Sequence, residues 1–218
     1  QDALPSSLLV IGSGFIRCEM ASFFSALGVK TTILARGPRL LSREDEEIED
    51  VFQTEFSRGV NTILHAQLTD LYHDGSAFVA TIDAGGESKM LNVDKVLFAT
   101  GRVPNTEYLN LEASGLSTDD RGFIAVNDEL ETPVSGIFAA GDVNGRYMLQ
   151  HAASFETHYL QRKLLKGIPG PINEGHIAHA VYAYPEVASV GWTEQVLKDS
   201  GRPYIAVYED WLNSARAM

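Results

Sequence analysis

A tight glycine turn between an apolar strand and a helix constrains the fold of this chain more than any other feature. The run LLVI at 8–11 predicts a buried parallel strand, the turn GSG at 12–14 follows directly, and the stretch 15–27 predicts a helix. A second β-rich run at 31–34 completes a βαβ unit. Because neighbouring parallel strands need a crossover of this kind, the sequence predicts an α/β fold.

The pattern after the βαβ unit predicts one more helix, a meander and two further strands. Ser42 and Asp45 form a capping-box start for the helix. The predicted apolar face of this helix consists of Ile48, Val51, Phe52 and Phe56. The strands and the meander are expected at 62–64, 67–93 and 95–100.

Glycines and prolines divide the chain into shorter pieces after residue 103, so we place a domain boundary there. A second boundary at the glycine- and proline-rich stretch 167–171 gives three segments, which are 1–103, 104–170 and 171–218. The elements expected in the last two segments are a helix over 149–166, strands at 178–184, 187–190 and 204–208, and a short helix at 193–199.

The balance of charge excludes several classes of partner. The 218 residues include 29 acidic and 17 basic side chains, and the net charge of −12 argues against nucleic acid. No apolar run approaches the ~20 residues that a bilayer requires, and no N-terminal signal is visible. We therefore expect a cytoplasmic chain with small-molecule or protein partners and no membrane partner.

The single cysteine, Cys18, is too few for a disulfide framework, a redox CxxC pair or a zinc site. We expect it to be a buried core thiol. His176 and His179 have no acidic or cysteine partner at ligand spacing, so we expect structural histidines and no metal site. No residue of the chain is assigned a catalytic role.

The glycine turn has the composition of a pyrophosphate-binding turn. Gly12 and Gly14 let the backbone approach a pyrophosphate, and the N-terminus of the following helix supplies N–H groups and a positive dipole. The alternative is an ordinary tight turn between strand and helix. Arg17 occupies the position where a third glycine is typical, and it overpacks the contact if it points inward or reaches a phosphate if it points outward.

The end of the second strand indicates which nicotinamide nucleotide is preferred. An acid at this position accepts hydrogen bonds from the ribose 2′-hydroxyl and repels a 2′-phosphate. The matching residue here is Ala35, and Arg36 and Arg39 follow it. Because an arginine binds a phosphate through charge-assisted hydrogen bonds, the sequence favours NADP(H). The alternative is that the two arginines are solvated loop charges.

Five segments in a fixed order resemble one enzyme family. They are GSGFIRCEMA (12–21), TILAR (32–36), FATGRVPNT (98–106), FAAGD (138–142) and YPEVASVG (184–191). Their order and spacing are similar to those of the pyridine nucleotide-disulfide oxidoreductases, the flavoproteins that include glutathione reductase, dihydrolipoamide dehydrogenase and mercuric reductase. The resemblance covers essentially the whole chain.

The resemblance implies a Rossmann-like nicotinamide-nucleotide domain with a β-meander, a returning segment of the FAD domain and a partial α+β interface domain. These correspond to the segments 1–103, 104–170 and 171–218. It further implies that the chain is a fragment that lacks the N-terminal FAD segment with its redox cysteines and most of the dimerisation domain. We expect a homodimer through the C-terminal segment.

The resemblance also implies a set of nicotinamide-site residues. Phe15 corresponds to an aromatic residue over the nicotinamide pocket and Glu19 to an acid close to the nicotinamide, although Glu19 equally suits the dipole of its helix. Thr100, Gly101 and Arg102 resemble a strand end that lies beside both nucleotides, with a plain loop exit as the alternative.

The flavin-site residues implied by the resemblance lie further along the chain. Gly141 and Asp142 resemble the motif whose aspartate accepts a hydrogen bond from a ribityl hydroxyl. The helix aimed at the flavin ring would begin with Leu149, Gln150, His151 and Ala152. Its dipole suits negative charge on the reduced ring, whereas His151 itself is expected to be a capping or surface residue.

The implied function is that of an oxidoreductase fragment that binds NADPH for hydride transfer to FAD and on to a disulfide or related acceptor. FAD belongs to the full-length parent, and the fragment is expected to be inactive alone. Two alternatives stay open, a self-contained NADP-dependent dehydrogenase and a non-catalytic nucleotide-binding or dimerisation module.

Overall fold

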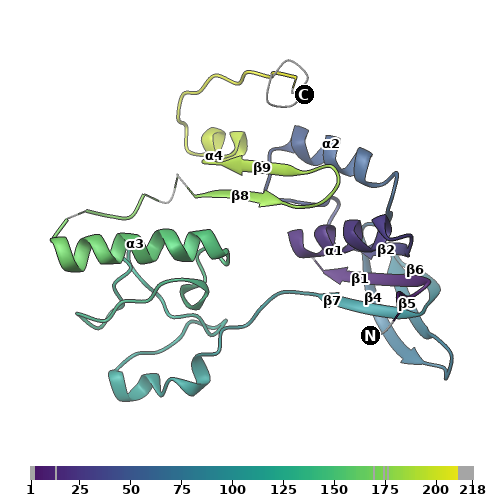
Figure 1. Ribbon diagram of the computed structural model, residues 1–218, viewed down its shortest axis with the longest axis horizontal. Helices are drawn as coiled ribbons and strands as arrows, with labels where there is room; N and C mark the ends of the chain where they lie inside the picture. Colours follow the sequence, from purple (N-terminus) through teal and green to yellow (C-terminus); the bar gives the residue numbers. More distant parts are fainter. Residues whose placement is uncertain (1–2, 13, 169, 174, 176, 211–218) are drawn as a thin grey trace.

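The computed structural model describes residues 3–12, 14–168, 170–173, 175 and 177–210 (Figure 1). Ser13 of the glycine turn and His176 lie outside the described residues. The described chain is a mixed α/β structure, as the sequence predicted. Within it, no helix is both long and apolar enough to cross a membrane.

A parallel sheet forms the centre of the first half of the chain. Its strand order is β3-β2-β1-β7. The strands are β1 (Ser7–Gly12), β2 (Lys30–Leu34), β3 (Asn61–Ile63) and β7 (Lys95–Ala99). In the register of the sheet, Val10 of β1 lies between Ile33 of β2 and Leu97 of β7. The first strand is therefore central, which explains the apolar run from Leu8 to Ile11.

Successive residues of β1 enter two different cores. Leu8 and Val10 pack with Cys18 and Ala21 of helix α1 (Phe15–Ala26), which covers one face of the parallel sheet. Leu9 packs on the other face against a three-stranded antiparallel sheet of order β4-β5-β6. This second sheet is the predicted meander, and its strands are β4 (Ala66–His73), β5 (Phe78–Ala84) and β6 (Glu87–Val93).

Helix α2 (Glu46–Phe56) forms where it was predicted, but its buried face differs from the prediction. Glu49, Phe52 and Phe56 are buried, whereas Ile48 and Val51 are exposed. The spacing of three and then four residues gives a narrow stripe toward the core, and Ile48 and Val51 lie outside it. Asp45 is the N-cap residue, but its side chain makes no capping hydrogen bond.

A single stretch of chain leads from β7 into a second half with little regular structure (Figure 1). Its short turns are η1 (Thr106–Tyr108), η2 (Leu111–Ser114) and η3 (Asp142–Asn144). Two isolated antiparallel bridges, between Thr118 and Ile124 and between Glu131 and Phe138, are also present here. Helix α3 (Gln150–Lys166) follows, and Gly167 ends it in the left-handed conformation, as predicted.

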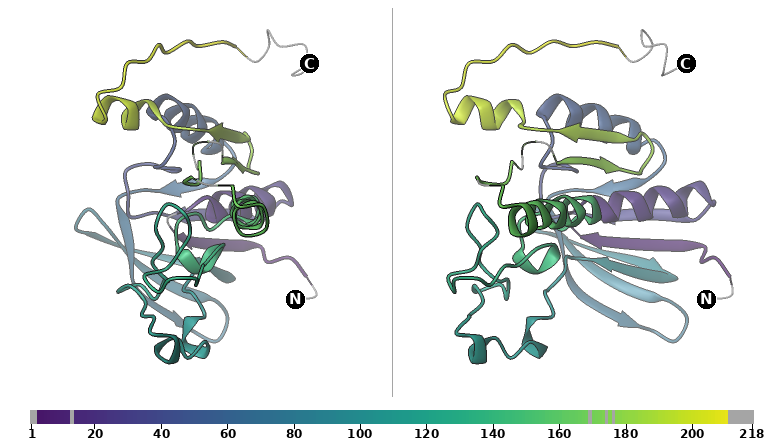
Figure 2. Two further views of the ribbon diagram at one scale, coloured as in Figure 1. Left: turned by 90° about the vertical axis from the view of Figure 1, so that its left-hand side faces the viewer. Right: turned by 60° about the vertical axis from the view of Figure 1, so that its left-hand side comes forward.

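The chain then returns to the first half. The hairpin of β8 (Ala178–Val181) and β9 (Val187–Val190) lies over α1, on the side opposite the parallel sheet (Figures 1 and 2). Val181, Ala183 and Val187 belong to the same core as α1. The predicted strand over 178–184 is shorter than expected because Val181 pairs with Val187, which leaves 182–186 as the connecting loop.

The strand predicted at 204–208 does not form. Helix α4 (Glu194–Asp199) ends near the start of an exposed stretch that has no strand partner among the described residues. Two phenols hold this stretch instead, since the hydroxyl of Tyr204 donates to Glu194 and that of Tyr208 donates to Glu47. Aromatic and β-branched residues predicted a strand here, but a strand requires a neighbour to pair with.

Candidate functional site

Gly12 lies at the carboxyl end of β1, directly opposite Ala99 of β7. A Cβ atom added at Gly12 would overlap the carbonyl oxygen of Ala99. Only glycine therefore lets these two strands approach as closely as they do. This position is glycine because of strand packing, independently of any ligand.

Gly14 is the N-cap residue of α1 and has a different environment. No heavy atom outside its immediate neighbours lies within 4 Å of a Cβ atom added there. No described side chain caps the helix, and its first turn holds no acidic residue. The first-turn N–H groups of α1 thus have no side-chain cap among the described residues and lie at the positive end of a helix dipole, which fits a pyrophosphate group.

Arg17 points inward. Its side chain is buried, and Nη1 donates a hydrogen bond to the carbonyl oxygen of Gly12. Nε has no partner among the described residues. Of the two orientations open from the sequence, the structure has the one that fills the contact between strand and helix, and the guanidinium ties α1 to the end of β1.

Cys18 is the buried core thiol that the sequence predicted. It is fully shielded from solvent. Burial raises the pKa of the Cys18 thiol to about 11, although the guanidinium of Arg17 beside it acts in the opposite direction. The thiolate that nucleophilic or redox chemistry requires is therefore suppressed at neutral pH.

The end of β2 opens onto a small polar cavity. Ala35 is buried and donates its N–H to the carbonyl oxygen of Ile63, so it presents no side chain to a ligand. Arg36 is exposed and lines a cavity of about 270 Å³ together with His65, Gln67 and Asp83. Its guanidinium makes no ion pair or hydrogen bond with any residue the structure describes.

Arg39, unlike Arg36, is paired with acidic side chains. Its guanidinium lies 3.3 Å from Glu46, 3.4 Å from Glu49 and 3.4 Å from Asp50. Burial raises the pKa of Glu49 and the arginine opposes this shift. Arg39 therefore holds the preceding loop to α2, and Arg36 is the arginine left to face a ligand at the strand end.

Glu19 and Phe15, the residues implied for a nicotinamide pocket, contact other parts of the chain. The carboxylate of Glu19 accepts a hydrogen bond of 3.0 Å from the N–H of Tyr182. The neighbouring Ser22 hydroxyl accepts one of 2.9 Å from the N–H of Tyr184. Phe15 packs partly buried against the core. The loop between β8 and β9 is thus anchored on α1 by two hydrogen bonds that the sequence did not predict.

The second implied nucleotide site brings together residues from both halves of the chain, on either side of the stretch that follows β7. Thr100 is exposed, and Gly101 has a φ of +124°, a conformation that favours glycine. Arg102 then donates to Asp142 at 2.7 Å and to the carbonyl oxygen of Met148. The arginine thereby joins the exit of β7 to the turn after Gly141 and to the start of α3.

Glu156 is a functional candidate that the sequence reasoning missed. This carboxylate on α3 is fully buried, and it accepts hydrogen bonds from the N–H of Gly141 at 2.6 Å and from the side chain of Asn144 at 2.9 Å. Gly141 has a φ of +78°, and Glu156 fixes its turn against the helix. A signal was present, because Glu156 follows the buried Ala152 by four residues and so lies on the same helix face.

The start of α3 resembles that of α1. Leu149 is its N-cap residue without a side-chain cap, and the first turn holds no acidic residue. Gln150 and His151 are exposed, whereas Ala152 is buried. These features and the Gly141 turn fit an anionic group such as a reduced flavin, whereas the carboxylate of Asp142 is paired with Arg102.

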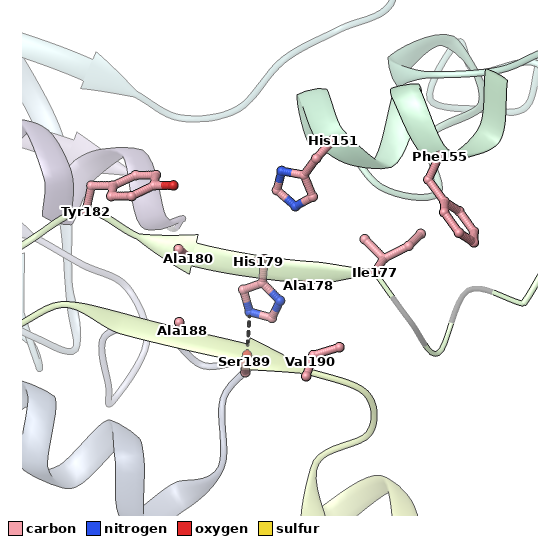
Figure 3. Close-up of a pocket in the computed structure, with 10 residues that line it drawn as sticks. All are labelled: His151, Phe155, Ile177, Ala178, His179, Ala180, Tyr182, Ala188, Ser189 and Val190. Atoms are coloured by element: carbon pink, nitrogen blue, oxygen red, sulfur yellow. Dashed lines mark hydrogen bonds between the residues drawn. The ribbon is translucent and has the colours of Figure 1, made fainter. Parts of the chain in front are cut away.

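A wide apolar cavity of about 610 Å³ separates the start of α3 from the hairpin (Figure 3). His151 and His179 project into it from opposite sides, from α3 and from β8. His179 was predicted to be structural, and it contacts Ser189 at 2.9 Å and Glu44 at 2.6 Å. Glu44 stands far away in the sequence, so ligand spacing did not reveal this acidic partner.

The arrangement of these three residues is not that of a hydrolytic triad. Glu44 and Ser189 both contact Nε2 of His179, and the serine hydroxyl also donates to the glutamate at 2.7 Å. A triad requires the acid on the opposite ring nitrogen. Among the residues placed by the structure, no group of three or more side chains could hold a metal ion.

The chain matches a known family over most of its length. Residues 1–157 match the family described as pyridine nucleotide-disulphide oxidoreductase. A dihydrolipoyl dehydrogenase of Rhizobium etli is 36% identical over 205 residues, which cover 92% of this chain and 42% of the relative. A mercuric reductase of Staphylococcus aureus is 33% identical over 199 residues, covering 91% of this chain and 36% of the relative.

Solved structures show the same similarity. The crystal structure of LpdA from Mycobacterium tuberculosis has a TM-score of 0.83 and 29% identity, covering 92% of this chain and 43% of that chain. The HOCl-induced flavoprotein disulfide reductase RclA from Escherichia coli has a TM-score of 0.81 and 30% identity, covering 92% of this chain and 46% of that chain. The chain spans less than half the length of the relatives it matches. With its strand, turn and helix elements in the same order and fold, the chain belongs to the pyridine nucleotide-disulphide oxidoreductase family.

Proposed function

We propose that this chain binds NADP(H) and delivers its hydride to FAD, as part of a longer oxidoreductase that passes electrons to a disulfide or related acceptor. The observation that carries the choice of nucleotide is the end of β2, where Ala35 is buried and Arg36 faces an open polar cavity. No carboxylate stands at the position that would bind a ribose 2′-hydroxyl and repel a 2′-phosphate.

The residues of the chain then have distinct tasks in binding. The first-turn N–H groups of α1, opened by Gly14, bind the pyrophosphate of the dinucleotide, and Arg36 binds the 2′-phosphate. Phe15 and Glu19 border the nicotinamide end. Their contacts with the core and with Tyr182 fix that end of α1 relative to the C-terminal hairpin.

The second half of the chain supplies part of the flavin site. FAD, when bound, accepts the hydride and carries electrons onward. The Gly141 turn and the start of α3 orient it, with Leu149, Gln150, His151 and Ala152 at the helix end and Thr100, Gly101 and Arg102 between the two nucleotides. Glu156 fixes the Gly141 turn by accepting a hydrogen bond from the N–H of Gly141.

The domain limits follow the same division. We propose a nucleotide-binding segment at 1–103, a returning FAD segment at 104–170 and part of an interface domain at 171–218. Exposed Tyr182, Tyr184, Val190 and Trp192 on the last segment support a homodimer formed through it.

Titration calorimetry tests the choice of nucleotide. NADPH is expected to bind more tightly than NADH by about tenfold or more, because hydrogen bonds to a charged group contribute about 1.5–3 kcal/mol. Arg36→Glu should abolish or reverse this difference. Arg58→Glu, which changes an exposed arginine at the end of α2, serves as the control and should leave it unchanged. Equal affinities for the two nucleotides in the unaltered chain would refute the assignment.

A further inference from the structure

The cavity at the end of β2 holds a second basic side chain besides Arg36. Its walls come from three places: the loop after β2, the residues that lead into β4, and the turn between β5 and β6. His65, which immediately precedes β4, is exposed and lines this cavity. Like Arg36, its side chain has no hydrogen-bond partner in the part of the chain that is described.

The backbone holds His65 beside Arg36. The N–H of His65 donates to the carbonyl oxygen of Gly37 at 3.2 Å, and the N–H of Ala66 donates to that of Ala35 at 3.0 Å. His65 also has a φ of +50°, a left-handed conformation that is uncommon for residues other than glycine. Strain of this kind persists where the surrounding structure fixes it, and it is frequent at ligand sites.

The charges on the cavity wall favour one kind of ligand. Arg36 is positive, Gln67 is neutral, and Asp83 is negative with one carboxylate oxygen accepting the N–H of Gly86 at 2.8 Å. Arg36 and Asp83 alone give the wall no net charge, which suits a neutral ribose. A protonated His65 makes the wall net positive and adds a donor, which suits a phosphate monoester.

We propose that His65 is a specificity-determining residue of this cavity and that it binds the 2′-phosphate of NADP(H) together with Arg36. This inference rests on the proposed nucleotide function. Because histidine changes charge between about pH 5 and pH 8, the preference for NADPH over NADH then depends on pH. The preference is strongest where His65 is protonated and falls as the pH rises.

The phosphate itself complicates a simple pH profile. The second ionisation of a phosphate monoester has a pKa of about 6, so the ligand itself loses negative charge as the pH falls through that value. The contribution of His65 is therefore the difference between the unaltered chain and a variant that cannot titrate. His65→Asn is the suitable variant, because asparagine tolerates the left-handed conformation.

The experiment measures the binding of NADPH, NADH and 2′,5′-ADP to the full chain by calorimetry at about pH 6 and about pH 8. His65→Asn should weaken NADPH and 2′,5′-ADP about tenfold at the lower pH and less than about threefold at the higher pH, with NADH unchanged. Repeating the titration in buffers of different ionisation enthalpy should show proton uptake that the variant loses. His158→Asn, an exposed histidine on α3, is the matched control.

Each other outcome is decisive. If NADPH binds more tightly than NADH but His65→Asn alters neither affinity nor proton uptake, the role of His65 is refuted and the proposed function stands. If the variant weakens the binding of NADPH and of NADH equally, His65 supports the cavity without contacting the 2′-phosphate, and the inference fails. If neither nucleotide binds the unaltered chain, the proposed function fails and this inference falls with it.

Discussion

At the scale of single residues, Gly12 and Gly14 have the same identity for different physical reasons. Gly12 is enclosed by the neighbouring strand, whereas Gly14 borders open space at the start of α1. A sequence motif treats the two as equivalent. Substitution distinguishes them, because Gly12 is required by the packing of the sheet, whereas Gly14 leaves room for a ligand.

We expect Gly12→Ala to lower the free energy of unfolding by about 1–3 kcal/mol, since the added methyl group forces β1 and β7 apart. Gly14→Ala should cost only about 0.5–1 kcal/mol, because its Cβ meets no neighbour and only the less favourable N-cap residue counts. Urea denaturation of the two variants measures both effects. Equal stability of the variants would contradict the proposed strand packing.

The buried thiol of Cys18 makes stability depend on alkaline pH. Its pKa is about 11 in the folded chain, above the ordinary value of about 8.5 that it regains on unfolding. Its contribution is therefore fully present below the unfolded-state pKa and is lost as the pH rises toward 11, by up to about 1.4 kcal/mol per pH unit. Cys18→Ala should show a smaller loss of stability over this range in denaturation at several pH values.

Burial of Cys18 could be predicted from sequence because the cysteine lies on the apolar face of a helix next to a strand. The orientation of Arg17 could not, since both an inward and an outward side chain satisfy the same pattern. The ion pairs of Arg39 with the start of α2 depend on how a loop folds back. The local sequence does not show how close Arg39 comes to these carboxylates.

At the scale of elements, α3 and the turn around Gly141 form one unit through Glu156. Removing its carboxylate leaves the buried donors of Gly141 and Asn144 without this acceptor. We expect Glu156→Ala to cost about 3 kcal/mol and Glu156→Gln, which keeps one oxygen, about 1 kcal/mol. Glu112→Ala, at an exposed acid, should stay within about 0.5 kcal/mol. Thermal or chemical denaturation distinguishes the three, and equal effects would contradict the buried network.

Sequence periodicity predicted the order of the elements in the first half well, because most of them contribute residues to one of two cores. The βαβ unit and the meander have patterns that match their buried faces. Periodicity failed where pairing with another strand decides whether a strand forms and where it ends. The run 204–208 has the composition of a strand but meets no strand to pair with, and the end of β8 is set by its pairing with Val187 rather than by composition.

At the scale of the whole molecule, the positions of the sulfur and of the nucleotide sites limit what this chain can catalyse by itself. Thiol–disulfide exchange needs an exposed thiolate and a second sulfur to resolve the mixed disulfide. The only cysteine in the sequence is on the buried face of α1. In the proposed function, this chain therefore supplies nucleotide binding but no exposed thiolate for exchange with a disulfide.

We expect no turnover when the purified chain is supplied with NADPH and FAD and assayed against lipoamide and oxidised glutathione. The physical reason is the absence of a usable thiolate at neutral pH. NADPH oxidation followed by absorbance measures the rate. Disulfide turnover that survives Cys18→Ser would show that another site carries the chemistry.

The hairpin of β8 and β9 has a consequence for how the chain behaves when it is concentrated. Each strand has four residues, and within the described chain each pairs only with the other. Both outer edges therefore present backbone N–H and C=O groups that can pair with a strand from another molecule. The exposed side chains of Val190 and Tyr182 add apolar surface beside these edges. Within the described chain, these edges are therefore open to edge-to-edge pairing with another strand.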